Sequence, residues 1–439
     1  MEQKKVRSFG FRGWMLIVYQ FIAYITYQSF TQYPLNILAD LYGGAQKVSS
    51  IYSICAVVGI LVQVVLAGVV ARMKKIKLFG SILGAVTLVL AFLVMTLQAG
   101  TGWVICYALI NVISVLYATF ALGILVGQWF PTRKGVVMDI ATLAFPIANG
   151  LLGPFASAVF AKGFPDVTGA FLPFLIVSII GWVIGLIFIK DYPEECGAFR
   201  DNDRSMTPEV AKAIMEAEIQ NKKTSVWTYL HTLACKEFWF GTICVALLLS
   251  CSIGLMSQSN AIITHYENLN YTTIMALIMV FGCIGSYVLG VLDQKLGTRK
   301  AMIISSILMI IGGVLGIFDN PGTLVASLIF VAMFMGASSN FGVSAAAQYW
   351  RREDFSRIFT LSSPIGSAIA SASPVVIASL LFGATGYKGH SGAFTMVAIC
   401  GVVALVVMLL YKPAHIKAMD DKYRAAAGKP LDDELVGRK

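Results

Sequence analysis

One stretch of the sequence combines an apolar composition with a regular series of amide, phenol and hydroxyl side chains. Between residues 14 and 37 these side chains recur mostly every three or four positions, which places them on one face of a helix. They are Gln20, Tyr24, Tyr27, Gln28 and Thr31. Such groups donate and accept hydrogen bonds without a formal charge. The face therefore predicts one wall of a cavity that binds a small organic molecule.

Two later apolar stretches, at about 238–263 and 322–348, carry further neutral polar groups. The substrate-binding candidates selected there are Ser252, Met256, Gln258, Asn260, Ser339 and Asn340. Hydrogen bonding between neighbouring helices is the alternative role for Ser and Asn side chains in such surroundings. Glutamine and tyrosine are more costly to bury without a partner, so the series that begins at Gln20 is the stronger candidate.

The sequence carries no constellation that would catalyse a reaction or hold a cofactor. It contains no HExxH segment, no phosphate-binding loop and no Ser, His and Asp cluster, which metalloproteases, nucleotide-driven proteins and hydrolases would show. The eight cysteines include no CxxC pair, which argues against a zinc site or a disulfide framework. We therefore expect no catalytic residue, no bound metal and no cofactor.

Composition identifies the surroundings in which these side chains work. Of 439 residues, 57% are hydrophobic and 13% are charged, and the mean hydropathy is +0.77. A soluble domain carries about 25% charged residues, so this chain has too little polar surface for water and is predicted to lie in a lipid bilayer. Its net charge of +10 is spread over short clusters, whereas a nucleic-acid footprint gathers on one face. We expect no nucleic-acid partner.

The apolar stretches predict the fold class. A helix that crosses a bilayer needs about 20 mainly apolar residues. Such stretches centre on about 14–37, 48–71, 78–97, 102–128, 135–161, 170–189, 238–263, 272–292, 301–318, 322–348, 358–383 and 392–411. We predict an all-α membrane protein of about 12 transmembrane helices, and we expect a monomer. The predicted parts are a six-helix half (1–190), a cytoplasmic linker (191–237), a second six-helix half (238–411) and a cytoplasmic tail (412–439).

The basic residues predict an orientation. If both termini face the cytoplasm, 30 of the 33 Lys and Arg residues fall on that side, and only Lys47, Lys162 and Lys388 lie outside. Cytoplasmic loops of membrane proteins carry an excess of Lys and Arg, so we predict cytoplasmic termini. The short outer loops indicate the cytoplasmic (inner) membrane of a prokaryote.

The two predicted halves share a sequence pattern. Thr142-Leu143-Ala144-Phe145-Pro146-Ile147 returns 218 residues further on as Thr360-Leu361-Ser362-Ser363-Pro364-Ile365. Coincidence among apolar helices of simple composition is the alternative explanation. Gly169-Ala170-Phe171 also returns as Gly392-Ala393-Phe394 in the same order, which favours a duplication. Two parallel six-helix halves are the architecture of major facilitator transporters.

The chain resembles the major facilitator superfamily over essentially its whole length. That family carries a G-x-x-x-D-R-x-G-R-K/R loop between helices 2 and 3 and a weaker copy between helices 8 and 9. The second copy stands here as Gly290-Val291-Leu292-Asp293-Gln294-Lys295-Leu296-Gly297-Thr298-Arg299-Lys300, with its Asp one place early. In the first copy Arg72 stands where the family has Asp. The resemblance implies a carboxylate at the cytoplasmic gate.

Four charged residues are therefore predicted to act in gating or proton coupling. Asp293 is predicted to pair with the region of Arg133 and Lys134 when the cytoplasmic side is closed. Arg357 stands at the cytoplasmic mouth of its predicted helix. Asp139 lies about one turn into an apolar stretch, where it acts either as a proton carrier or as a gate or helix-start residue.

Within the superfamily, three segments are most similar to the oxalate/formate antiporter and monocarboxylate transporter group. They are Trp129-Phe130-Pro131-Thr132-Arg133-Lys134-Gly135, Asp191-Tyr192-Pro193-Glu194-Glu195-Cys196-Gly197, and Lys236-Glu237-Phe238-Trp239 with Gly254-Leu255-Met256. The resemblance implies a carboxylate substrate that is exchanged or carried with a proton. The oxalate/formate exchangers place basic residues in the middle of helices 8 and 11, but the stretch 272–292 contains no Arg, Lys or His. A buried dicarboxylate without a cation would be costly, so oxalate is not expected.

We therefore predict a secondary active transporter of a small organic solute, a monocarboxylate-type anion, that works by alternating access with proton coupling or exchange. Proton-coupled efflux of amphipathic compounds and transport of a zwitterionic solute are the alternatives. The efflux alternative is supported by the segment Asn149–Ala158, which is loosely similar to the helix 5 motif of drug-efflux antiporters.

Overall fold

The structure is a computed structural model of the whole chain. The residues it describes are 8–32, 39, 43–70, 75–97, 100–130, 133–160, 167–203, 207, 209–210, 213, 216, 225–351, 354–383 and 386–431. They are almost entirely helical, because long apolar segments of Leu, Ile, Val, Ala and Gly can satisfy their backbone groups within a bilayer only as helices.

The first bundle contains the helices before residue 190. They are α1 (Gly10–Tyr27) with the π-helix η1 (Gln28–Gln32), α3 (Ala45–Val70), α4 (Ile76–Thr96), α5 (Thr101–Val115) with the π-helix η3 (Leu116–Ala121) and α6 (Leu122–Trp129), α7 (Lys134–Thr142), α8 (Ala144–Phe160) and α9 (Val167–Phe188). Two short 3-10 helices follow, η4 (Pro193–Cys196) and η5 (Arg200–Asn202).

The second bundle contains the helices after the linker. They are α11 (Tyr229–Ala234), α12 (Lys236–Ser257), α13 (Ser259–Thr264), α14 (Tyr271–Leu296), α15 (Thr298–Leu315), α16 (Pro321–Ala332), α17 (Ala337–Tyr349), α18 (Phe355–Ser371), α19 (Ser373–Leu381), α20 (Ser391–Leu410) and α21 (Pro413–Ala426). A small antiparallel hairpin of β1 (Phe382–Gly383) and β2 (Gly386–Tyr387) connects α19 to α20.

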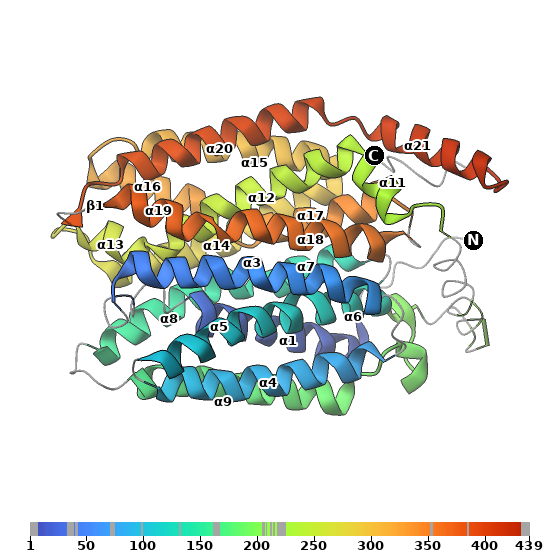
Figure 1. Cartoon of the computed structure of the whole chain (residues 1–439), viewed down its shortest axis with the longest axis horizontal. Coiled ribbons are helices and arrows are strands. Elements are labelled where there is room, and N and C mark those ends of the chain that lie inside the picture. The colour runs from blue at the N-terminus through green and yellow to red at the C-terminus, as the bar shows by residue number, and fades with distance from the viewer. Residues whose placement is uncertain are drawn as a thin grey trace.

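Figure 1 shows the two bundles lying side by side, with the blue-to-green helices on one side and the yellow-to-red helices on the other. The helices run nearly parallel to one long axis. We call the end that holds α11 and α21 the linker end, and the end that holds α13 and β1 the hairpin end.

The described helices agree with the predicted fold class. Within the described residues, nine helical segments are long and apolar enough to cross a membrane. Three interrupted rods, α1 with η1, α7 with α8 and α16 with α17, complete a set of twelve. The prediction of an all-α membrane protein of about 12 transmembrane helices is confirmed.

Close helix packing depends on small residues, as expected in lipid, where packing holds helices together. A Cβ atom at Gly313 of α15 would lie 2.5 Å from the backbone nitrogen of Ala398 in α20. The bundles meet along two seams: α14 packs against α8, and α3 packs against α18 and α19. The cavity lies between these seams.

Candidate functional site

A cavity lies between the two bundles and is lined by residues of both. Its free space, including the part open to solvent, is ≈1280 Å³. The first bundle contributes Tyr24, Tyr27, Gln28, Gln32, Thr119, Met138, Phe145 and Asn149. The second bundle contributes residues of α12, α17 and α18, and Tyr411 after α20.

The wall from α1 and η1 is built as a hydrogen-bonding surface. Three of the five residues predicted there, Tyr24, Tyr27 and Gln28, line the cavity. The Tyr27 hydroxyl lies 3.3 Å from the Tyr52 hydroxyl of α3, and Gln28 Nε2 donates to Gln32 Oε1 at 2.6 Å. These contacts fix the amide and phenol groups at the cavity edge.

The other two residues of the predicted face are placed elsewhere. Gln20 Nε2 donates to the Ala118 carbonyl at 2.7 Å, and Thr31 Oγ1 donates to the Tyr27 carbonyl at 2.7 Å. Gln32 takes the place in the lining that was predicted for Thr31. The reason is the π-helix from Gln28 to Gln32, since its wider turn shifts the side-chain register away from the 3.6-residue period.

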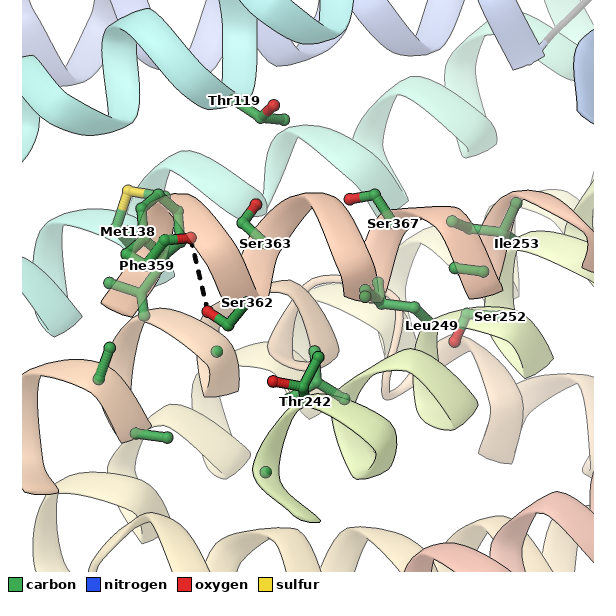
Figure 2. Close-up of a pocket in the computed structure, with 18 of the residues that line it drawn as sticks. Thr119, Met138, Thr242, Leu249, Ser252, Ile253, Phe359, Ser362, Ser363 and Ser367 are labelled. Carbon is green, nitrogen blue, oxygen red and sulfur yellow. Dashed lines mark hydrogen bonds between the residues drawn. The ribbon is translucent and has the colours of Figure 1, made fainter. Parts of the chain in front are cut away.

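The wall from α12 and α18 is lined by small polar and apolar side chains. Figure 2 shows Ser363 and Ser367 of α18 pointing toward Thr119 of the first bundle, while Ser362 points toward Thr242 of α12. Ser362 Oγ donates to the Phe359 carbonyl at 3.5 Å. The predicted residues Ser252 and Met256 of α12 line the same cavity, so α12 contributes both a polar and an apolar side chain to its wall.

Gln258, Asn260 and Asn340 are not among the described residues that line the cavity. Gln258 Nε2 donates to Ser49 Oγ of α3 at 3.3 Å, and Asn260 is partly exposed in α13. Asn340 Nδ2 donates to Asp139 Oδ1 at 2.7 Å and to Thr142 Oγ1 at 2.8 Å. The side chain of Ser339 lies outside the described part of the structure. Gln258 and Asn340 thus connect the two bundles.

The structure places Asp139 near Asp293. The predicted pairing of Asp293 with the region of Arg133 and Lys134 stays a prediction for the state closed to the cytoplasm, and the side chain of Lys134 lies outside the described part of the structure. A Cβ atom at Gly290, one turn before Asp293, would lie 2.7 Å from Asp139 Oδ2, and Asp293 lies beside Thr298 at the start of α15. A carboxylate is stabilised at such a helix N-terminus. Arg133 lies apart, since its Nη1 donates to the Ser8 carbonyl at 3.2 Å.

The last predicted gate residue, Arg357, also acts on the linker. Its Nη1 donates to the Trp227 carbonyl, and its guanidinium carbon lies 5.9 Å from the centre of the Tyr229 ring. Arg133 is tied to the linker as well, because its backbone nitrogen donates to Asp201 Oδ1 at 3.0 Å. Both arginines therefore bind the segment of the chain that connects the two bundles.

The linker end of the cavity contains a residue that the sequence analysis did not select. Glu237, the second residue of α12, is fully buried and lines the cavity with Phe238, Trp350 and Tyr411. Its Oε2 lies 2.6 Å from Nδ1 of His415 on α21. The residues that the structure describes in the cavity wall include no Lys, Arg or His, so Glu237 gives this wall a negative character.

Three side chains at this end carry atoms that could ligate a metal. Ligand atoms of Cys235, Glu237 and His415 lie within 4.8 Å of one another. The carboxylate oxygen nearest to the imidazole is already engaged in the 2.6 Å contact. We therefore assign Glu237 and His415 as a hydrogen-bonded acid and base.

The polar face of α18 could have been found from its spacing. Ser363, Ser367 and Ser371 recur every four residues, and Ser362 and Gly366 follow the same interval. Small polar residues at that interval form one helix face. The burial of Glu237 has no such signal, because it depends on α21 returning to cover the start of α12.

Comparisons with known proteins agree with this architecture. Residues 238–433 match the family model of the Major Facilitator Superfamily. The human organic anion transporter MFSD10 (TETRAN) superposes with a TM-score of 0.65 at 13% identity, covering 91% of this chain and 99% of that one. The proton:xylose symporter XylE, solved with 6-bromo-6-deoxy-D-glucose, gives 0.66 at 12% identity, covering 91% and 95%. A search of curated proteins gives no match. The chain has the major facilitator fold.

Proposed function

We propose that the chain, which has the fold of major facilitator transporters, is a secondary transporter that moves a small organic solute by alternating access. The single observation that carries the proposal is a cavity lined by both bundles. A site at such an interface changes its exposure when one bundle rocks against the other. In this proposal the two bundles are the halves predicted at 1–190 and 238–411.

Hydrogen bonds between the bundles supply contacts that such rocking would break and form. At the hairpin end, Ser53 Oγ of α3 donates to the Ser371 carbonyl of α18 at 2.7 Å. Toward the linker end, Asn340 of α17 binds Asp139 and Thr142 of α7. Each bond is worth only about 0.5–3 kcal/mol, so solute binding can shift the balance between states.

The electrostatics of the cavity favour a zwitterionic or amphipathic solute. The described lining supplies hydroxyl, amide and aromatic groups and one carboxylate, so an isolated anion would find no opposite charge there. A monocarboxylate is the second candidate, and one observation favours it. Trp350 Nε1 and the Tyr411 hydroxyl are buried at the cavity without a hydrogen-bond partner among the described residues, and both can donate to a carboxylate.

The orientation of the protein in the membrane and the residue that couples transport to protons complete the proposal. The linker end faces the cytoplasm of a prokaryotic cell, in line with the distribution of Lys and Arg residues. Asp139, packed against α14 and bound to Asn340, is the proposed proton-coupling residue, because carboxylates within membrane helices often carry protons.

A cavity-filling substitution tests the transport proposal. A thermal-shift screen of the purified chain against zwitterions, amphipathic amines and monocarboxylates first identifies a solute, whose uptake is then measured in proteoliposomes. Gly366→Trp should abolish that uptake, because a Cβ atom at Gly366 meets only the Thr242 carbonyl at 3.9 Å and the ring would fill the cavity. Gly102→Trp is the matched control at an exposed glycine with space around it. Equal uptake by both variants would refute the assignment of the cavity.

Orientation is tested by labelling with a membrane-impermeant maleimide. A cysteine at Lys388, exposed beside the hairpin, should react from outside intact cells, and one at Lys422, exposed on α21, only after permeabilisation. The sites Lys162 and Lys222 serve the same purpose but lie outside the described residues. The reverse pattern would overturn the orientation.

A further inference from the structure

Glu237 is a buried carboxylate with one oxygen left to bind something else. The residue is 0% exposed, and its Oε2 is in hydrogen-bond contact with His415. Its Oε1 is buried and has no hydrogen-bond partner among the described residues. An unsatisfied buried carboxylate oxygen is costly, and this residue lines the cavity. A hydrogen-bond donor from a ligand would remove that cost.

The surroundings of Glu237 suit a positively charged donor. Phe238, Trp350 and Tyr411 line the same end of the cavity, and aromatic rings attract cations through their faces. The described lining contains no Lys, Arg or His, and the nearby His415 contacts the other carboxylate oxygen of Glu237. A neutral donor would satisfy the oxygen, but a cationic donor also compensates the charge and forms the stronger hydrogen bond.

We propose that the linker end of the cavity binds the ammonium group of an organic solute, with Glu237 Oε1 accepting its hydrogen bond and the rings of Phe238, Trp350 and Tyr411 around it. This inference rests on the proposed transport function and names a substrate class for it: amines and amino-group zwitterions. The apolar body of the solute extends along α18 toward Ser363 and Ser367, which line the rest of the cavity.

The other polar groups beside Glu237 contact its Oε2, since Cys235 Sγ donates to this oxygen at 3.6 Å and His415 Nδ1 lies 2.6 Å from it. Tyr411 also lies close to Glu237, and Tyr349 and Arg299 lie beside Tyr411. Burial raises the pKa of the Cys235 thiol to about 11, so it stays neutral. The guanidinium of Arg299 is bound to the carbonyls of Met408 and Leu409.

Three probes of the same size and different charge test the site. Benzylammonium, benzyl alcohol and benzoate are titrated into the purified full-length chain by isothermal calorimetry at pH 7.5. Benzylammonium should bind tightest, and Glu237→Gln should weaken it by about tenfold or more, as expected for loss of a hydrogen bond to a charged group. The amide oxygen of Gln can still accept from His415, so the variant keeps its fold, which melting without ligand verifies. Glu267→Gln, at an exposed loop position, is the matched control and should change nothing.

The same measurements separate a ligand role of Glu237 from a structural one. If Glu237→Gln binds benzylammonium as the unmodified chain does, or if the three probes bind equally, Glu237 only ties α21 to α12 and the inference is overturned. In that case the transport proposal is still tested separately, by the uptake measured with Gly366→Trp.

Discussion

The two ends of the cavity are built from different chemistry. Toward the hairpin end the bundles are joined by uncharged groups: Ser53 to the Ser371 carbonyl and Gln258 to Ser49. At the linker end the contacts involve charged groups: Asp139 with Asn340 between the bundles, and Arg351 with Asp420 within the second bundle. Uncharged bonds break at little cost, whereas a buried charge that loses its partner is expensive. The hairpin end is therefore the easier one to open, and the linker end is held by the stronger contact.

The largest expected effect is at the linker end, within the second bundle. Arg351 Nε and Nη2 donate to Asp420 Oδ2 at 3.1 and 3.0 Å, and Asp420 is 0% exposed. Arg351→Met should lower the free energy of unfolding by about 3–5 kcal/mol, because it leaves a buried carboxylate without its charge partner. Thermal unfolding in detergent measures this.

Lys417→Met provides the contrast on the same helix. Lys417 lies 4.0 Å from Asp421 with about a third of each side chain exposed, so the substitution should cost about 0–1 kcal/mol. Equal losses of stability in the two variants would show that burial of the Arg351 pair does not stabilise α21.

An intermediate effect is expected at the contact that joins the bundles beside Asp139. Asn340→Ala removes both bonds from Asn340 and should weaken this contact by about 1–3 kcal/mol. The ratio of molecules open at the linker end to molecules closed there should then rise by about 5- to 150-fold. Spin-label distances across that end report the fraction. Asn111→Ala is the matched control, since its Nδ2 donates to the Tyr107 carbonyl within one bundle. If the spin-label distances in the Asn340→Ala variant show no increase in the open fraction, the proposed role of this contact in closing the linker end is contradicted.

The smallest effect is expected at the hairpin end. Ser53→Ala removes the bond to the Ser371 carbonyl and should cost about 0.5–1.5 kcal/mol, with a higher fraction of molecules open at that end. Ser50→Ala on the same helix removes only a bond to the Gln46 carbonyl of its own turn. It should leave both the stability and the open fraction unchanged. A larger loss from Ser53→Ala than from Asn340→Ala would reverse the comparison of the two ends.

Sequence patterns predicted the helices and part of the cavity, and the failures have local causes. The apolar stretches correspond to the described rods because hydropathy and length decide which segments can span a bilayer. On α1 and η1, the side chains of Tyr24, Tyr27 and Gln28 line the cavity, and the π-helix brings Gln32 into the lining instead of Thr31. Periodicity alone does not reveal a π-helix, since it is a local departure from the 3.6-residue turn.

Tertiary contacts account for the other differences. Glu237 was placed in the linker at 191–237 because it stands at the edge of an apolar stretch. Its burial comes from α21, a polar helix nearly 180 residues away, which no local pattern predicts. Asn340 was interpreted as a binding residue, whereas its amide holds Asp139 across the bundle interface, and such pairings are visible only once the two bundles are placed together.

The central claim is that the cavity opens at one end at a time, and distances across both ends test it most directly. Spin labels at Lys47 and Lys388 span the hairpin end, and labels at Lys75 and Lys295 span the linker end; all four side chains are exposed. The account predicts two populations in reconstituted protein, in which one distance lengthens as the other shortens, and a solute that binds the cavity should change their ratio. Two distances that stay fixed, or that lengthen together, would contradict alternating access.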